Sequence, residues 1–144
     1  MADCVFCKII AGTAKAEAVY EDESALAFLD NHPASRGHTL VIPKTHAETL
    51  DHLSEAQLGP LFLAVKRVMG LLETSLQPAG LNVGWNHGWA AGQRVDHLHV
   101  HLIPRYAGDG GAGIQFLVHG SVREDLASIA DQLRSASPPR SAGG

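Results

Sequence analysis

Three histidines, His97, His99 and His101, stand at alternate positions in the segment DHLHVHLIPR. Successive side chains of a β-strand point to opposite faces, so we expect the three imidazoles on one face and the intervening apolar residues in the core. Such a histidine face suits a zinc site, or a nucleophile that attacks phosphorus as a neutral imidazole. A merely solvated face is the third interpretation, which the strict alternation disfavours. The pattern alone does not decide between metal binding and catalysis.

A second group with chemical potential lies near the N-terminus. Cys4 and Cys7 are the only cysteines and form a C-x-x-C pair. The loop between them is too short for a disulfide to restrict the unfolded chain much. In a reducing compartment this spacing is typical of half a metal site or of a redox dithiol.

The composition limits the classes of protein to consider. With 144 residues and a net charge of -4, the chain is expected to form one domain over 1–135 and to have no nucleic acid partner. It contains no apolar run of the ~18 residues that a membrane span needs and no pattern of a signal peptide. We therefore expect a soluble, cytoplasmic protein with no membrane association. The Ser-, Pro- and Gly-rich tail over 136–144 is predicted to be disordered.

The elements that must position these groups begin with a short helical turn over 7–10. Two β-type runs at 18–20 and 24–29 predict a hairpin, and HTLVIP over 38–43 predicts a buried strand. After the long helix described next, adjacent antiparallel strands are expected at 81–88 and 95–104.

One long helix is predicted over 54–75. Ser54 and Gln57 have capping box spacing, and apolar residues recur at helical intervals after them. Pro60 is expected either to kink this helix or to delay its start. A final amphipathic helix is expected over 122–133. Because strands and helices do not alternate regularly, the order of elements predicts an α+β fold with an antiparallel sheet.

Several blocks together resemble the histidine triad (HIT) superfamily of nucleotide hydrolases and transferases, and in particular its Hint-type bacterial members. HLHVHLI matches the signature His-φ-His-φ-His-φ-φ, in which φ is apolar. Similar blocks, in the family's order, are CVFCKIIAG, VYEDESALAFLD, GHTLVIPKTHAETL, LNVGWNHG and AGQRVDHLHVHLIPR. The resemblance covers about residues 4–134. It implies a HIT-like fold with a five-stranded antiparallel sheet, one long helix and a C-terminal helix, and a homodimer formed through the long helix and a sheet edge.

The resemblance implies a catalytic role for three histidines. His99, the middle member of the triad, would attack the α-phosphorus of a nucleotide derivative and carry the nucleotide on its ring until water releases it. Its other ring nitrogen would be held by a backbone carbonyl. His101 would contact phosphate oxygens, and His38 would complete the histidine cluster from the neighbouring strand.

The resemblance also implies substrate and metal ligands. Phosphate, ribose and base would be contacted, in that order, by the amides Asn86 and Gln93, by the carboxylate Asp30, and by the apolar side chains Phe6, Ile9 and Leu29. Bacterial relatives with the C-x-x-C pair carry a structural zinc, and here its ligands would be Cys4, Cys7, His46 and His97. The alternative for the cysteines is a free dithiol without metal.

The implied activity is hydrolysis of purine nucleoside 5′-phosphoramidates of the adenosine type, through a nucleotidyl-histidine intermediate. The alternatives are a dinucleoside polyphosphate hydrolase or phosphorylase, and a nucleotide-binding regulatory protein without catalysis. Arg94 departs from the family pattern, in which many relatives have Ser or Thr, and is expected either to grip further phosphates or to be solvated. Trp85 and Trp89 are also unusual, and could form a wall around the leaving group or a dimer contact.

Overall fold

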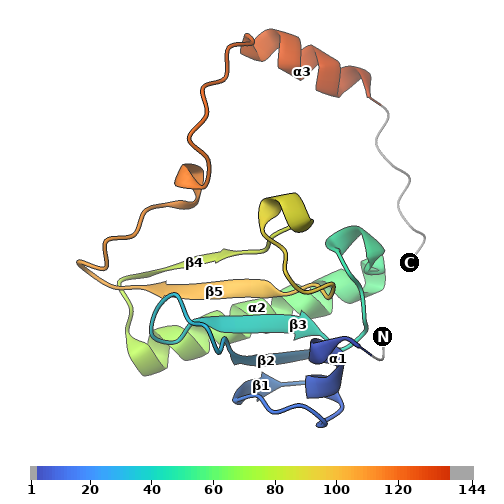
Figure 1. Ribbon diagram of the computed structural model, residues 1–144, viewed down its shortest axis with the longest axis vertical. Coiled ribbons are helices and arrows are strands. Elements are labelled where there is room, and N and C mark those ends of the chain that lie inside the picture. Colours follow the sequence, from blue (N-terminus) through green and yellow to red (C-terminus); the bar gives the residue numbers. More distant parts are fainter. Residues whose placement is uncertain (1–2, 137–144) are drawn as a thin grey trace.

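A five-stranded antiparallel sheet organises the chain in the computed structural model, which describes residues 3–136 (Figure 1). Its strands are β1 (Ala18–Glu21), β2 (Ala25–Leu29), β3 (Thr39–Pro43), β4 (Gly80–Gly84) and β5 (Val100–Arg105). Their order across the sheet is β1-β2-β3-β5-β4, and every neighbouring pair is antiparallel. The α+β class, the hairpin and the adjacent pair formed by the two last strands are therefore confirmed.

Each face of the sheet is covered by its own apolar layer. The long helix α2 (Glu55–Leu76) packs on one face, where it buries Val65 and Val68 against Val41, Val100 and Leu102. On the other face, the short helix α1 (Val5–Ile10) contributes Phe6 to a cluster with Leu26, Phe28, Leu40 and Ile42. Alternate residues of the same strands supply the two layers, because successive side chains point to opposite faces.

The long helix begins where the sequence predicts, but not with the predicted cap. The Ser54 side chain makes no hydrogen bond to the helix backbone, and its hydroxyl donates instead to Oε1 of Gln57 at 3.1 Å. Pro60 lies within α2 and does not delay its start. Burial of the apolar face of α2 therefore outweighs the hydrogen bond that Pro60 cannot donate.

The histidine segment is less extended than predicted, since β5 begins only at Val100. The N–H of Leu98 donates to the carbonyl of Ala47, beyond the end of β3, at 2.7 Å. The pairing of β3 with β5 ends at Val41 and Val100, and Pro43, two residues further along β3, has no N–H with which to extend it. His97 and His99 thus precede the strand, and the prediction of a strand from residue 95 is wrong for its first five residues. The strand predicted over 81–88 is likewise shorter and ends at Gly84.

The last helix, α3 (Leu126–Ser135), lies at the end of an extended stretch away from the sheet (Figure 1). It begins four residues later than predicted because Asp125 caps it, its carboxylate accepting the N–H of Ser128 at 3.0 Å. The tail predicted over 136–144 lies, apart from Ala136, outside the described residues. None of the helices within residues 3–136 combines the length and hydropathy needed to cross a bilayer.

Candidate functional site

The three histidines lie on the same side as the apolar layer that contains Phe6, although only His101 belongs to a strand. Leu98, Val100 and Leu102 are buried in the layer beneath α2, and His101 pairs across the sheet with Leu40 of the opposite layer. His38, immediately before β3, brings its Nε2 to 2.9 Å from Nδ1 of His101. The cluster is buried rather than displayed on an open surface, because His97, His99 and His38 are each less than 9% exposed.

The hydrogen bonds of His99 fix its tautomer. Its Nδ1 lies 2.7 Å from the carbonyl oxygen of His97. A carbonyl only accepts, so Nδ1 carries the hydrogen and Nε2 keeps its lone pair. Burial lowers the pKa of His99 below its ordinary value, more than the hydrogen bond to His97 raises it. His99 is therefore a neutral imidazole at neutral pH with a lone pair on Nε2, the form that attacks phosphorus.

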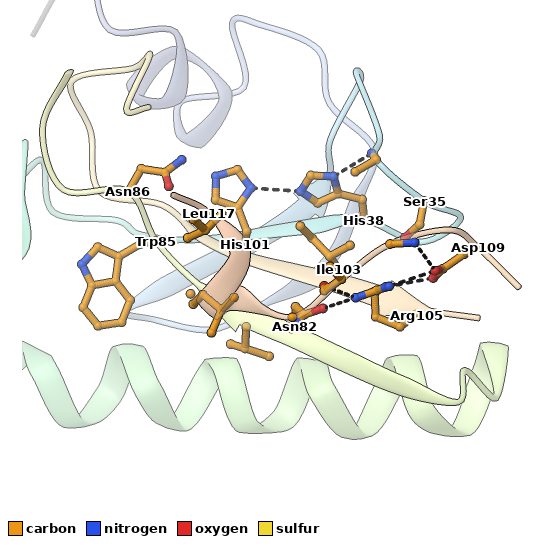
Figure 2. A pocket seen from close by; sticks show the side chains of 17 residues that line it. Ser35, His38, Asn82, Trp85, Asn86, His101, Ile103, Arg105, Asp109 and Leu117 are labelled. Atoms are coloured by element: carbon orange, nitrogen blue, oxygen red, sulfur yellow. Dashed lines mark hydrogen bonds and ion pairs between the residues drawn. The ribbon is translucent and has the colours of Figure 1, made fainter. Parts of the chain in front are cut away.

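A second chain of hydrogen bonds fixes His38 and His101. The N–H of Ala34 donates to Nδ1 of His38 at 3.0 Å, so the hydrogen of this ring is on Nε2 and is donated to Nδ1 of His101 (Figure 2). His101 must then carry its own hydrogen on Nε2. That atom is buried and has no hydrogen-bond partner among residues 3–136.

The unpaired N–H of His101 is a donor prepared for an anion. A buried donor without a partner costs about 1–3 kcal/mol, and an incoming phosphate oxygen would remove that cost. Burial, together with the neighbouring rings of His99 and His38, lowers the pKa of His101 to about 4. The ring is thus neutral near pH 7 and donates without carrying a charge.

Asp30 lies beside this chain, with its Oδ2 3.5 Å from Nε2 of His38. Its Oδ1 accepts the N–H of His32 at 2.9 Å, which fixes the carboxylate at the end of β2. Burial lowers the pKa of His38 more than Asp30 raises it. The pair is therefore a neutral imidazole beside a carboxylate, and Asp30 keeps an oxygen for a further donor.

Two hollows meet at His38. The smaller one, of about 390 Å³, is lined by Leu29 and Asp30 together with the turn over 33–37. The larger one, of about 480 Å³, lies against His101 and runs between β4, β5 and the stretch that follows β5 (Figure 2). Its further lining includes Trp85, Asn86, Ile103, Arg105 and Ile114. His38 thus lies where the two hollows meet, and His101 lines the larger one.

The larger hollow includes one cation, Arg105, whose charge is already balanced. Its Nε and Nη2 each lie 2.8 Å from a carboxylate oxygen of Asp109. Its Nη1 donates to Asn82 and to the carbonyl of Ala112, each at 2.7 Å. Sequence reasoning missed Arg105, although it continues the period-2 face of His101 and Ile103.

The remaining predicted ligands fall into two groups. Asn86 lines the larger hollow and Leu29 lines the smaller one. Gln93 is buried, both hydrogens of its amide nitrogen are donated to the carbonyls of Glu48 and Val95, and its oxygen accepts the N–H of Gly88. No donor of Gln93 is left for a phosphate, and the structure makes it a support of the loop.

The predicted base contacts of Phe6 and Ile9 are likewise not reproduced by their positions. Phe6 is buried in the core, and Ile9 packs against the same cluster. Neither side chain lines either hollow.

Arg94 stacks on the exposed ring of Trp89, 4.2 Å from the ring centroid. It lines neither hollow, so it is not placed to grip further phosphates.

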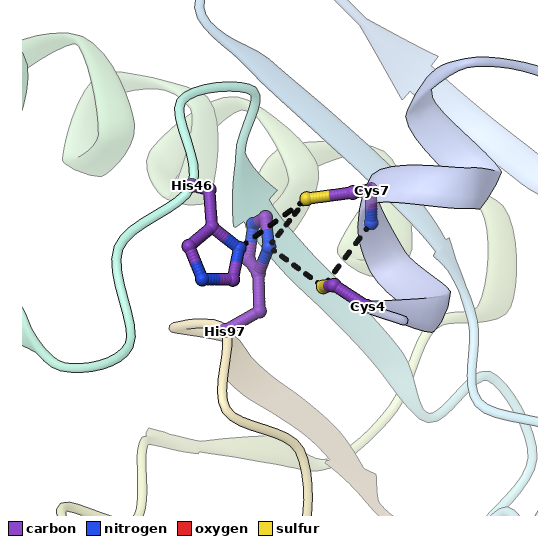
Figure 3. A group of neighbouring side chains, drawn as sticks. All are labelled: Cys4, Cys7, His46 and His97. Carbon is purple, nitrogen blue, oxygen red and sulfur yellow. Dashed lines mark hydrogen bonds between the residues drawn. The ribbon is translucent and has the colours of Figure 1, made fainter. Parts of the chain in front are cut away.

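Cys4, Cys7, His46 and His97 come together at the other end of the histidine segment (Figure 3). Nδ1 of His97 lies 3.4 Å from Sγ of Cys4, and Nδ1 of His46 lies 3.3 Å from Sγ of Cys7. The four ligand atoms all lie within 4.8 Å of one another. Sulfur and nitrogen ligands of one tetrahedral zinc ion are about 3.5 Å apart, so the four could hold such an ion.

The tautomer of His97 also suits a metal. Its Nε2 donates to the carbonyl of Pro43 at 2.9 Å, which leaves the lone pair on Nδ1 facing the two sulfurs. Metal-binding histidines usually donate their second ring nitrogen in this way. Within the triad, His97 thus faces the cysteines and His101 lines the larger hollow, whereas His99 lines neither hollow.

Comparisons with known proteins agree with this arrangement. A family model described as "HIT domain" matches residues 11–108. "Protein hit" of Bacillus subtilis is 42% identical over 133 residues, which cover 91% of this chain and 92% of the relative. "Adenosine 5'-monophosphoramidase hnt1" of Schizosaccharomyces pombe is 35% identical and covers 92% and 96%. A crystal structure of a Zn-bound histidine triad family protein from Mycobacterium smegmatis has a TM-score of 0.71 and 36% identity, and covers 94% of this chain and 99% of that one.

Proposed function

Because the chain belongs to the HIT domain family, we propose that it is a nucleotide hydrolase whose substrates are nucleoside 5′-phosphoramidates of the adenosine type. The observation that carries this proposal is the pair of opposite tautomers in the cluster. His99 offers a lone pair on Nε2, while His101 offers an unpaired N–H on its own Nε2. A nucleophile beside an unused donor suits attack on a phosphorus whose oxygens gain charge in the transition state.

The proposed reaction has two steps. In the first, Nε2 of His99 forms a bond to the α-phosphorus, the P–N bond to the amine breaks, and the amine leaves with its electron pair and a proton from solvent. In the second, water forms a bond to the same phosphorus, the bond to Nε2 breaks, and the water's proton returns to solvent. The products are the nucleoside monophosphate and the free amine, and His99 regains its lone pair. The N–H of His101 donates to a non-bridging oxygen in both steps.

The two hollows support an assignment of the substrate's two ends. The nucleoside would lie in the smaller hollow, where Asp30 can accept from ribose hydroxyls beside the partly exposed Leu29. The leaving group would lie in the larger hollow with Asn86. Arg105 in that hollow is neutralised by Asp109, so among the described residues that line the hollow a polyphosphate leaving group would find no free cation. This favours an amine over the nucleotide that a dinucleoside polyphosphate would release.

Zinc is the metal that we propose for the four-residue cluster. Two thiolates and two imidazoles form a closed set with no open position, which is typical of a structural zinc site. The ion would cross-link α1 to the ends of β3 and of the histidine segment, and it would supply no chemistry to the reaction. The Zn-bound relative from M. smegmatis supports this choice. Reduced thiols are retained in the cytoplasm, where we place the protein.

We further propose a homodimer. Phe62 and Leu63 on the outer side of α2 are exposed, and Trp85 lies beside Phe62 with ring centroids 5.7 Å apart. Leu117 and Leu126, in the stretch after β5 and in α3, are more than 70% exposed. Apolar surface of this extent is typical of an interface between subunits. Light scattering should give twice the chain mass, and a monomer at micromolar concentration would contradict this proposal.

The activity is tested with an adenosine 5′-phosphoramidate and, separately, a diadenosine polyphosphate, by following release of AMP. We expect turnover of the phosphoramidate by the wild type and none by His99→Ala. His119 is exposed and lines neither hollow, and His119→Ala serves as the matched control with full activity. Preferred turnover of the polyphosphate would favour the alternative hydrolase. Binding of AMP without turnover of either substrate would favour a nucleotide-binding regulatory protein.

A further inference from the structure

We propose that Phe6 is a positioning residue that makes the orientation of the His99 ring depend on occupancy of the metal site. Phe6 stands between Cys4 and Cys7 in the sequence and belongs to α1, the helix that carries Cys7. The link between the metal ligands, Phe6 and the His99 ring is inferred from the contacts of these side chains. Its consequence for the reaction rate rests on the proposed function of His99.

One aromatic ring contacts both parts of the histidine segment. The Phe6 ring packs edge-to-face on His99, with centroids 5.2 Å apart at 81°, and on His97, with centroids 5.8 Å apart at 76°. It also contacts the aromatic ring of Phe28 on β2, with centroids 5.4 Å apart. Phe6 is only 7% exposed, so it has no room to move while α1 is in place. It forms a wall against the ring that we assign as the nucleophile.

His99 needs this wall because a single hydrogen bond does not aim its reactive nitrogen. The bond from Nδ1 to the carbonyl of His97 fixes one atom of the ring. The ring can still swing about that point, which would move Nε2 away from the phosphorus. Errors of about 1 Å in placing a reacting atom can cost about 100-fold in rate. The edge-to-face contact with Phe6 restricts the swing.

The position of the wall depends in turn on the metal ligands. The helix α1 has six residues, too few to be stable by their own hydrogen bonds. Its two cysteines face His46 and His97, from the segments that follow β3 and precede β5. A metal ion bound by all four would fasten both ends of the turn that presents Phe6. Without the ion, the loss of this cross-link would release α1 and its aromatic ring.

The test compares Phe6→Ala and Phe6→Leu with Leu26→Ala in the metal-loaded protein, and with the wild type after chelation. Leu26 is buried in the same apolar cluster but lies on β2, so its loss weakens the core without removing the aromatic wall. The readouts are the NMR signal and solvent exchange of the His99 Nδ1–H, in histidine-labelled protein, and the separate values of kcat and KM for an adenosine phosphoramidate. Circular dichroism checks that each sample is folded.

We expect the metal-loaded Phe6→Ala protein to behave like the wild type after chelation. In both, the His99 Nδ1–H should exchange faster with solvent and its NMR signal should broaden. For Phe6→Ala, kcat should fall at least roughly tenfold while KM changes less than about twofold, because orientation and not affinity is lost. Phe6→Leu should be intermediate, and Leu26→Ala should leave the signal unchanged. Chelation of Phe6→Ala should add little further change.

An unchanged His99 signal in folded, metal-free wild type would overturn the proposal, and so would an equal effect of Leu26→Ala and Phe6→Ala. If the metal-free protein unfolds, the test rests on the metal-loaded Phe6→Ala and Phe6→Leu proteins, whose His99 Nδ1–H signals are compared with that of Leu26→Ala. If the wild type turns over no phosphoramidate, the proposed function fails, whereas the NMR comparison still tests the link between α1 and His99.

Discussion

Replacing His101 with phenylalanine tests the tautomers on which the site depends. The substitution keeps a ring of similar size and removes the unpaired N–H on Nε2. Loss of one donor to a developing oxyanion typically costs about 100- to 1,000-fold in kcat, or roughly 3–4 kcal/mol. Because the donor acts mainly on the transition state, KM for an adenosine phosphoramidate should change much less. The activity of His101→Phe should therefore be at most about one hundredth of the wild-type value.

The same substitution should not destabilise the fold at neutral pH. It removes a buried, unpaired donor that costs about 1–3 kcal/mol. It also removes the acceptor for Nε2–H of His38, but Oδ2 of Asp30 lies 3.5 Å from that nitrogen and can replace it. We expect the free energy of unfolding at pH 7 to stay within about 1 kcal/mol of the wild type or to exceed it.

The sign of the pH dependence separates this account from a simple loss of packing. The pKa of His101 is about 4 in the folded protein and about 6.5 in the unfolded chain. Between these values the unfolded chain binds a proton that the folded protein does not. The wild type should therefore lose stability as the pH falls from about 6.5 to 4, by up to about 3 kcal/mol from this group. His101→Phe should lack that part of the loss.

Urea unfolding at pH 7 and pH 5, together with steady-state kinetics at pH 7, measures these three quantities, with exposed His119→Phe as the matched control. The reasoning is refuted if His101→Phe keeps more than about a third of the wild-type kcat. It is also refuted if both proteins lose equal stability between the two pH values.

Three further predictions concern the surroundings of the site. Cys7→Ser should lose the bound metal, measured by elemental analysis, and should lower the midpoint of thermal unfolding by several degrees, whereas full metal content would contradict the ligand set. Gly37→Ala should lower the free energy of unfolding, measured in urea, by about 2 kcal/mol, because Gly37 has φ +89° and a Cβ there would collide with Leu76. An unchanged urea midpoint would show that the turn before His38 accommodates the added Cβ. Gln93→Leu should lower the free energy of unfolding by about 2–4 kcal/mol, because it leaves three backbone groups unpaired. If the substitution changes only KM and not stability, Gln93 contacts phosphate and does not support the loop.

The predictions that agree best with the structure rest on the alternation of apolar and polar residues, which indicates which side chains are buried. The alternation of His97 to Leu102 correctly separated an apolar side from a histidine side, even where the strand itself is absent. Periodicity records which side chains are buried and not which backbone groups are paired, so it overestimated the length of the strand. The Cys2His2 set came from the resemblance, since neither spacing nor composition relates Cys4 to His46.

Other parts of the site depend on partners that no local pattern reveals. Gln93 has the chemistry of a phosphate ligand, but its donors are taken by the carbonyls of Glu48 and Val95. Arg105 has a charge suited to phosphate, and its neutralisation depends on the turn that returns Asp109 to it. An amphipathic C-terminal helix could be predicted from its periodicity, whereas its position away from the sheet could not.

The central claim is that His99 carries the nucleotide during turnover. The direct measurement is mass spectrometry of protein mixed with an adenosine phosphoramidate and quenched within one turnover at alkaline pH, where a P–N bond to histidine survives. The account predicts one added adenylyl group, located by fragmentation on His99 and absent from His99→Ala. Release of AMP by a His99→Ala protein, or wild-type turnover without any adduct on His99, would contradict it.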